Sequence, residues 1–314
     1  MTTTISAPVA TPVAAPVSVR DGSVRRSGRG HGHGRGPATL MVLGSCTSLQ
    51  VGAALATHLF PVTGASGATL LRLALAAVPM LVATRPGIRT WTRAQWRYVL
   101  LFGLTLAGMN GFFYAAIARI PLGIAVTVEF LGPLTLAAAL SRRPRDLGWV
   151  LLALLGVGTL GWAGGSGSGG SLDVVGIVFV LAAAVFWVLY ILLGARVGAA
   201  VPGKGGLAVA MTFAAIILSP VGMRGAVHIA ERPSFLLVAL GTALMASVVP
   251  YSLEFAAMRR LPRRNFGILL SLEPAVATLA GWLVLGQTVG ALAVVAIVAV
   301  VAASVGSTLT ATTR

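Results

Sequence analysis

Two glutamates stand in stretches that share their length and the positions of their prolines. Residues 121–133 read Pro-Leu-Gly-Ile-Ala-Val-Thr-Val-Glu-Phe-Leu-Gly-Pro, and residues 262–274 read Pro-Arg-Arg-Asn-Phe-Gly-Ile-Leu-Leu-Ser-Leu-Glu-Pro. The acids are Glu129 and Glu273. A carboxylate at the centre of a membrane helix costs about 2.5–3.5 kcal/mol, so it normally faces a partner or a cavity. Each glutamate could therefore bind a cation or carry a proton.

Other polar side chains interrupt the apolar runs at comparable depths. With about 1.5 Å of rise per residue, the first four runs each place one polar residue on the order of 10–14 Å below the outer surface. These residues are Gln50, Arg72, Asn110 and Glu129. The polar residues of the second half are expected nearer the cytoplasmic side, and they are Tyr190, Tyr251, Glu254 and Glu273. We predict a substrate site formed by Gln50, Arg72, Asn110, Tyr114, Glu129, Tyr190 and Tyr251.

Arg72 and Glu129 are predicted to pair, because either charge alone would be costly in lipid. Two interpretations of this pair remain open. It could be a permanent ion pair that fixes the second predicted helix against the fourth. Alternatively, it could open onto a transport pathway, where a zwitterionic amino acid would place its carboxylate on Arg72 and its ammonium on Glu129.

Among the intramembrane acids, Glu273 is predicted to be the leading proton carrier and Glu254 the second. A proton carrier has to titrate, and burial away from cations favours a neutral carboxyl group. The arginine partner of Glu129 would hold it ionised. Glu254 stands near Arg259 and Arg260, with which it could pair, or it could snorkel towards the interface. Glu273 has no cation within one helical turn.

The composition is that of a polytopic all-α membrane protein. Of the 314 residues, 57% are hydrophobic and 10% are charged, whereas soluble domains carry about 25% charged residues. The net charge of +16 would suggest nucleic acid in a soluble protein, but the basic residues fall in short loops between apolar runs. We therefore expect a lipid bilayer and no nucleic acid as partner. The single cysteine, Cys46, rules out an internal disulfide.

Ten apolar spans of membrane length, each of roughly 20 residues, are predicted to position the polar side chains. They cover approximately residues 38–59, 64–83, 97–118, 122–141, 147–164, 174–195, 206–223, 235–258, 265–285 and 288–310. The alternate loops that include both termini hold 19 arginines and lysines, whereas the opposite loops hold three. Because positively charged loops remain inside, both termini are predicted to be cytoplasmic.

The chain is predicted to consist of two inverted five-helix repeats. An offset of 141 residues superposes Pro61 on Pro202, Pro79 on Pro220, and the two proline-flanked stretches on each other. An odd number of crossings makes the second copy start from the opposite side, and inverted repeats with a midplane site are typical of secondary transporters. The predicted segments are a disordered cytoplasmic tail (1–36), a first repeat (37–164), a Gly/Ser linker (165–173) and a second repeat (174–311).

No catalytic residue, metal site or cofactor is predicted. His31 and His33 in the basic tail lack a third ligand, and the sequence contains no Walker-type phosphate-binding loop. Residues 64–67 read Gly-Ala-Ser-Gly and match a motif of intramembrane serine proteases. The histidines that could serve as base, His58 and His228, stand at or beyond helix ends, so an enzyme is not expected.

Several short motifs are spread along the apolar spans. They are Ser48-Leu-Gln-Val-Gly-Ala-Ala-Leu-Ala, Leu59-Phe-Pro, Leu71-Arg-Leu-Ala-Leu, Gly108-Met-Asn, Pro121-Leu-Gly-Ile-Ala-Val, Glu129-Phe-Leu-Gly-Pro, Pro250-Tyr-Ser-Leu-Glu, Arg260-Leu-Pro, Ser271-Leu-Glu-Pro and Gly306-Ser-Thr-Leu-Thr. Together they resemble the EamA-type drug/metabolite transporter superfamily, in its threonine/homoserine exporter-like branch. The resemblance covers about residues 40–310. Gln287 departs from the family pattern, which has a glutamate there, so this position cannot titrate.

The resemblance implies a secondary transporter of the inner (plasma) membrane that exports threonine- or homoserine-like amino acids by proton antiport. Its partners would be the amino acid, protons and the bilayer, and the protein would be a monomer or homodimer. An EamA-type exporter of another metabolite or a drug is the alternative within transport. A non-transporting scaffold or receptor is the alternative outside it, although a scaffold has no use for an intramembrane acid such as Glu129.

Overall fold

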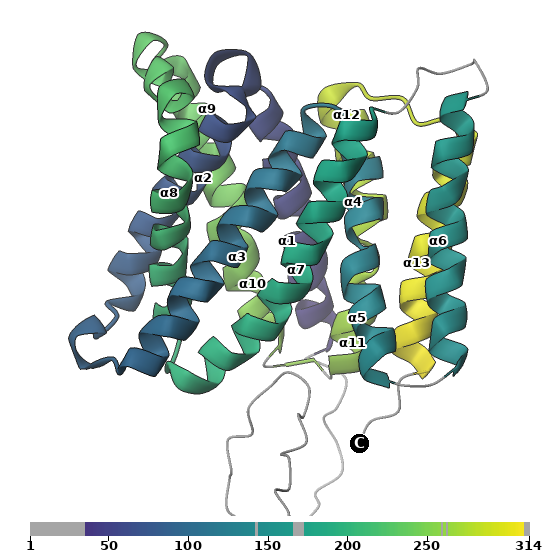
Figure 1. The fold of residues 1–314 in the computed structure, drawn as a ribbon, viewed down its shortest axis with the longest axis horizontal. Coiled ribbons are helices and arrows are strands. Elements are labelled where there is room, and N and C mark those ends of the chain that lie inside the picture. Colours follow the sequence, from purple (N-terminus) through teal and green to yellow (C-terminus); the bar gives the residue numbers. More distant parts are fainter. Residues whose placement is uncertain (1–34, 142–143, 166–172, 259, 262, 311–314) are drawn as a thin grey trace, which may run out of the picture.

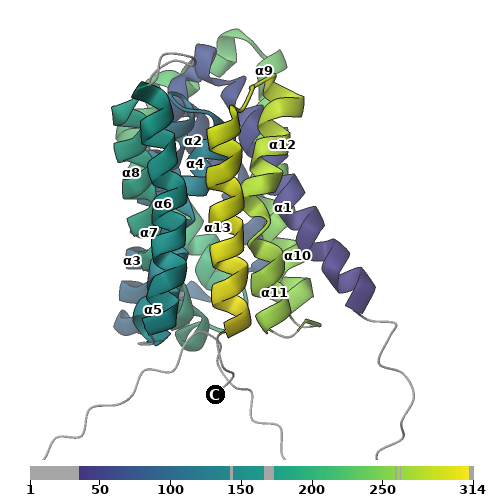
Figure 2. The same ribbon diagram turned by 90° about the vertical axis from the view of Figure 1, so that its right-hand side faces the viewer.

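The computed structural model describes residues 35–141, 144–165, 173–258, 260–261 and 263–310. Within these ranges every regular element is a helix, as the composition predicts. Figures 1 and 2 show a bundle whose long helices run from one end to the other. The predicted tail (1–36) lies outside the described residues except at its last two positions, and most of the predicted linker (165–173) also lies outside them.

Short connections join the helices in chain order. The helices before residue 166 are α1 (Arg35–Thr57), α2 (Phe60–Thr84), η1 (Ile88–Thr90), α3 (Arg93–Ile117), α4 (Leu122–Glu129), α5 (Leu131–Ser141) and α6 (Pro144–Gly165). Those after residue 172 are α7 (Val174–Ala200), α8 (Gly205–Ala226), η2 (Val227–Glu231), α9 (Ser234–Ala243), η3 (Leu244–Val248), α10 (Val249–Met258), α11 (Arg263–Leu270), α12 (Glu273–Leu285) and α13 (Ala291–Thr310).

Nine helical stretches of the described residues are long and apolar enough to cross a membrane, judged by length and composition. They coincide with nine of the ten predicted spans. The fifth predicted span corresponds to α6, whose 22 residues extend about 33 Å at 1.5 Å per residue. The chain is therefore a multi-pass membrane protein.

The fourth and the ninth spans are each interrupted within one of the proline-flanked stretches. The fourth span is divided into α4 and α5, and the ninth into α11 and α12. Proline donates no hydrogen bond to the carbonyl four residues earlier, so Pro133 leaves the carbonyl of Glu129 without a helical partner. Pro274 has the same effect on Leu270. Glu129 and Glu273 stand at the two breaks and are both buried, as interrupted backbone at membrane depth requires.

The eighth span contains a different irregularity. Between α9 and α10 the element η3 is one π-helical turn, in which the N–H of Val249 bonds to the carbonyl of Leu244. A π turn holds an extra residue per turn, and such turns are frequent at functional sites. In this chain the extra residue turns main-chain carbonyls of η3 towards side chains on α1 and α2.

Helices from the two halves of the chain are interleaved. α2 packs on α8, α3 packs on α7, α1 lies against α10 and α12, and α4 lies against α12. At one edge of the bundle α6 pairs with α13 (Figure 1). Each of these contacts joins a helix before residue 166 to one after residue 172, so the two halves bury their faces on each other.

Glycines allow α2 and α8 to approach closely. A Cβ atom on Gly222 would lie 2.7 Å from the carbonyl oxygen of Ser66 and 2.9 Å from the Cβ atom of Leu70. A Cβ atom on Gly67 would lie 2.9 Å from the amide nitrogen of Ala226. Small residues at helix interfaces are a general means of close packing in membranes, and here a larger residue would force the helices apart.

We predict that Gly222→Ala lowers the thermal midpoint of the purified protein in detergent, because overpacking at such a site costs about 1–3 kcal/mol. The matched control is Gly241→Ala on α9, where the added Cβ would meet nothing within 4 Å. Alanine has the higher helix propensity, so the control should keep or raise the midpoint. A Gly222→Ala midpoint at or above that of the control would contradict the close α2–α8 contact.

Candidate functional site

Polar side chains on α1 contact two acids of the second half. The Ser45 hydroxyl donates a hydrogen bond to Glu254 Oε1 on α10 at 2.7 Å. Gln50 Nε2 donates to Glu273 Oε1, at the first residue of α12, at 3.0 Å. Gln50 and Glu273 were predicted to lie in separate layers. The structure corrects this, because the packing of α12 against α1 brings their side chains into contact.

Arg72 on α2 is buried, with 5% of its surface exposed, and it is bonded to neutral acceptors. Nε donates to the Ser247 hydroxyl at 3.1 Å, and Nη2 donates to the carbonyl of Ala246 at 2.6 Å. Nη1 donates to the Tyr114 hydroxyl at 3.2 Å, and the guanidinium carbon lies 5.3 Å from the Tyr114 ring centroid. The guanidinium thus ties α2 to α3 and to η3.

The predicted ion pair between Arg72 and Glu129 is not formed, and this prediction is corrected. Among the described residues, the salt bridges lie at helix ends and join Arg119 to Asp173 and His228 to Glu231. A buried guanidinium needs acceptors for its N–H groups, and the π turn supplies them without a carboxylate. Glu129 is therefore not required to neutralise Arg72 by direct contact.

The acceptors on η3 are available because α1 and η3 approach each other closely. A Cβ atom on Gly52 would lie 2.5 Å from the amide nitrogen of Ala246. One turn earlier on α1, the Ser48 hydroxyl donates to the carbonyl of Met245 at 2.7 Å. Two successive carbonyls of the π turn, those of Met245 and Ala246, therefore accept hydrogen bonds from side chains on α1 and α2.

Glu129 is the last residue of α4 and is 8% exposed. It lies within electrostatic range of Arg72 and of Glu273. Among the described residues, Glu129 forms a salt bridge with neither Arg72 nor Glu273. The two acids at the helix breaks thus share one electrostatic environment with a single arginine.

Tyr190 and Tyr251 lie next to each other and are half-buried. Their side chains interact, and both pack against the cluster of buried residues between α2, α3, α7 and α8. The Tyr190 ring stacks on Phe102, with 4.9 Å between centroids. The prediction that both tyrosines belong to one site is compatible with this placement.

Glu254 is held inside the bundle by its hydrogen bond from Ser45. Arg260, one of its two predicted alternative partners, instead has its Nη1 atom 3.5 Å from the sulfur of Met41. Arg259, the other, lies outside the described residues. Because Ser45 satisfies Glu254 from a neighbouring helix, the acid does not pair with Arg260.

Asn110 is buried but stands apart from the other predicted site residues in its bonding. Its amide donates to the carbonyl of Leu106 in its own helix at 2.8 Å.

Ser45 and Ser247, which bond Glu254 and Arg72, were missed by sequence reasoning. Serine is common inside membrane helices, so neither position carried a signal that set it apart.

Gln287, the residue that departs from the family pattern, closes the N-terminal end of α4. Its Oε1 atom accepts a hydrogen bond from the backbone N–H of Leu122 at 3.0 Å. The first N–H groups of a helix have no partner within the helix, so the amide supplies one. Gln287 follows Gly286, which has the left-handed backbone (φ 64°) that favours glycine.

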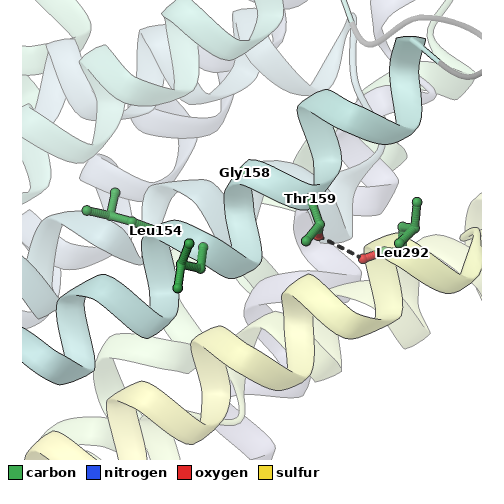
Figure 3. A pocket seen from close by; sticks show the side chains of 5 residues that line it. Leu154, Gly158, Thr159 and Leu292 are labelled. Atoms are coloured by element: carbon green, nitrogen blue, oxygen red, sulfur yellow. Dashed lines mark hydrogen bonds between the residues drawn. The ribbon is translucent and has the colours of Figure 1, made fainter.

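Two shallow hollows lie on the outside of the bundle. One, of about 300 Å³, lies between α6 and α13 and is lined by Leu154, Leu155, Gly158, Thr159 and Leu292 (Figure 3). The other, of about 400 Å³, lies between α2 and α8 and is also mainly apolar. None of the predicted site residues is among the residues that line these two hollows.

Outside the membrane-spanning segments, one ion pair joins two connections. Arg119 Nη1 donates to Asp173 Oδ2 at 2.7 Å, and Asp173 Oδ1 accepts from the backbone N–H of Val175 at 2.8 Å. The hydrogen bond from Arg119 lowers the pKa of Asp173 from its ordinary value. Asp173 therefore stays ionised as the N-cap of α7.

Comparisons with known proteins agree with this architecture. Residues 174–309 match the EamA-like transporter family. The threonine/homoserine exporter RhtA of Salmonella typhimurium (strain SL1344) is 43% identical over 271 residues, which is 86% of this chain and 91% of the relative. RhtA of Escherichia coli (strain K12) is 41% identical over the same length. A crystal structure with 21% sequence identity aligns with 88% of this chain and 97% of its own, with a TM-score of 0.56, and so shares the fold.

Apolar helices of membrane length, two of them interrupted beside buried acids, are the architecture of a membrane transporter. The relatives are similar over most of both chains, and the second half matches a family of transporters. The chain belongs to the EamA-like transporter family.

We predict that Ser247→Ala lowers the thermal midpoint in detergent, whereas Glu129→Gln does not. Ser247→Ala leaves Arg72 Nε without its acceptor, and an unsatisfied buried donor costs about 1–3 kcal/mol. Glu129→Gln removes none of the three hydrogen bonds of Arg72. The reverse order of midpoints would show that Arg72 depends on Glu129 and not on the π turn.

Proposed function

We propose that the protein exports small hydrophilic amino acids similar to threonine or homoserine, in exchange for protons, across the inner (plasma) membrane. The observation that carries this proposal is 43% identity over 91% of a relative named as a threonine/homoserine exporter. The buried acids at the two helix breaks give it a physical basis. Intramembrane acids mark substrate and proton pathways, and midplane sites at discontinuous helices are typical of secondary transporters.

An amino acid presents an ammonium, a carboxylate and, in threonine or homoserine, a hydroxyl. The acids Glu129 and Glu273 suit the ammonium. Arg72 has five N–H donors, of which three are engaged in the bonds described above. The remaining two could receive the substrate carboxylate, so Arg72 can both brace the helices and contact the substrate.

The polar side chains between the helix breaks, which we call the polar centre, are closed to solvent in this conformation. Gln50, Arg72, Glu129 and Glu273 are each between 2% and 8% exposed. A substrate reaches them only if helices move, and the α4–α5 and α11–α12 breaks are the natural places for such motion because their hydrogen-bond ladders are already interrupted. We infer that transport alternates the exposure of this centre between the two sides.

We further propose that the two halves are inverted repeats and that both termini are cytoplasmic. In support, the two proline-flanked stretches each hold a helix break next to a buried acid. Figure 1 shows the α2–α3 and α7–α8 connections at the same end of the bundle as the end of α13. The first of these connections carries Arg85 and Arg89, and the second carries Lys204.

The orientation predicts the response of topology reporters. A reporter fused after residue 314 should be active on the cytoplasmic side, and one inserted in residues 165–173 on the external side. The reason is the partition of 19 basic residues against three. The opposite pair of readings would overturn the orientation, whereas two readings on the same side would overturn the inverted repeat, which requires an odd number of crossings between the linker and the C-terminus.

Glu273 is the proposed proton carrier, and this predicts a separation of two activities in proteoliposomes. Glu273→Gln cannot release a proton, so it should abolish threonine accumulation driven by a pH gradient. Exchange of threonine at equal pH should persist in part, because exchange needs no net proton movement. Radiolabelled threonine measures both activities in the same preparation.

The matched control for this experiment is Glu231→Gln at the exposed end of η2. It removes a carboxylate of the same type outside the bundle and should retain both activities. If Glu273→Gln still accumulates threonine in response to a pH gradient, the carrier lies elsewhere and Glu254 is the next acid to test. If the wild type transports another metabolite but not threonine or homoserine, the substrate proposal fails while the transporter class stands.

A further inference from the structure

One end of the buried Gln50 amide has a partner and the other has none. Gln50 is 2% exposed, and its Nε2 donates to Glu273 Oε1 at 3.0 Å. Its Oε1 is buried without a hydrogen-bond partner. The large majority of buried side-chain polar atoms in proteins have a hydrogen-bond partner. An unpartnered amide oxygen beside a carboxylate therefore indicates a position that a donor from outside the protein fills.

The surroundings of Gln50 favour a cation as that donor. Glu273 accepts from Gln50 and lies within electrostatic range of Glu129 and Glu254. Arg72, the nearby cation, is bonded to acceptors on η3 and α3. A primary ammonium brings one positive charge and three N–H donors. It can satisfy the amide oxygen and a carboxylate at once, which a hydroxyl or a neutral amide cannot do as favourably.

The orientation of the Gln50 amide depends on whether Glu273 holds a proton. A carboxylate only accepts, so it keeps Nε2 facing itself and directs Oε1 away. A carboxylic acid donates through its O–H, and the amide can accept that bond with Oε1 after a half-turn about its terminal torsion, which is soft. The turned amide then presents N–H donors where Oε1 stood. An ammonium group then finds no hydrogen-bond acceptor on the Gln50 amide, because the N–H groups of the amide only donate.

We propose that Gln50 Oε1 and the Glu273 carboxylate form the subsite for the primary ammonium of the substrate, and that protonation of Glu273 turns the Gln50 amide and closes this subsite. The site would then hold either a proton or an ammonium, never both. This inference rests on the proposed function and supplies the step at which proton and amino acid exclude each other.

Other titratable groups near Glu273 come from three elements. They are Cys46 on α1, Glu129 on α4 and Glu254 on α10, and each interacts electrostatically with Glu273. The described part of α13, which also packs on α12, has no titratable side chain. A pH change in this centre therefore acts on a group of acids in which only Glu273 is bonded to an amide that can turn.

The first test uses the full-length wild type in detergent and compares three ligands by calorimetry. They are threonine, the hydroxy acid in which a hydroxyl replaces its ammonium, and the amino alcohol in which an alcohol replaces its carboxylate. The pH range is one in which the ligand charges stay constant. We expect the dissociation constants of both amines to rise as the pH falls, by up to about tenfold per pH unit for one competing proton. The hydroxy acid should bind more weakly and without this dependence.

The second test uses Gln50→Met, which keeps the length of the side chain but removes the amide. At the high end of the pH range it should weaken threonine binding about tenfold or more, the effect of one charge-assisted hydrogen bond. Its affinity for the hydroxy acid should equal that of the wild type. The control is Thr242→Val, because Thr242 Oγ1 is also buried without a partner but lies on α9. This control should bind threonine as the wild type does.

The outcomes separate this inference from the proposed function. Equal binding of threonine and the hydroxy acid by the wild type would overturn the ammonium subsite and leave amino-acid export standing. Gln50-dependent, pH-dependent binding of other primary amines but not of threonine or homoserine would support the subsite and refute the proposed substrate. Failure of every primary amine to bind the wild type would refute both. The wild-type comparison decides these cases even if Gln50→Met does not fold.

Discussion

The positive charge of Arg72, held in the interior of an apolar bundle, sets the constraint on which the surrounding helices depend. Its N–H groups must find acceptors inside the protein, because lipid offers none. The acceptors come from η3, whose π turn directs the Ala246 carbonyl and the Ser247 hydroxyl towards α2. The turn can do so only because Gly52 lets α1 lie close against it. The acceptors of this one buried cation thus lie on a π turn of one helix, against which the glycine of a neighbouring helix packs.

The same reasoning extends to the acids. Two of the three intramembrane glutamates stand at an irregular part of a helix: Glu129 ends α4 and Glu273 begins α12, whereas Glu254 lies further along α10, after the π turn. Regular helices satisfy their own backbone and leave nothing for a ligand to use. Irregular backbone exposes carbonyls and brings side chains of different helices together, which costs stability in lipid and is kept where protein surrounds it. The buried polar side chains and the helix breaks therefore occur together in this fold, because the breaks help to bring these side chains together.

Sequence reasoning located the apolar spans and the acids but not the bonds between them. An acid within an apolar run is visible in a single sequence, as is a proline that interrupts a helix, so Glu129 and Glu273 could be predicted as neighbours of breaks. The partner of Arg72 could not be predicted, because η3 contains neither proline nor glycine and one acceptor is a main-chain carbonyl. Counting residues from a helix end also treats helices as parallel rods. That approximation put Gln50 and Glu273 in separate layers, whereas the packing of α12 on α1 joins two residues 223 positions apart.

The charges of the buried acids and of Arg72 bear on the proposed exchange of amino acid for protons. Three acids lie within electrostatic range of one another through Glu273, and Arg72 is the cation that acts on Glu129. If all three acids were ionised, they would outnumber the arginine by two charges, and uncompensated charge in a low-dielectric interior is costly. In the proposed function, cations from outside make up the difference, either as protons or as the ammonium of the substrate. When the site holds neither a proton nor an ammonium, its uncompensated charge makes the conformational change costly. In the proposed function, the site therefore changes its exposure between the two sides of the membrane only when it is occupied, which favours exchange over an uncoupled leak of protons or substrate.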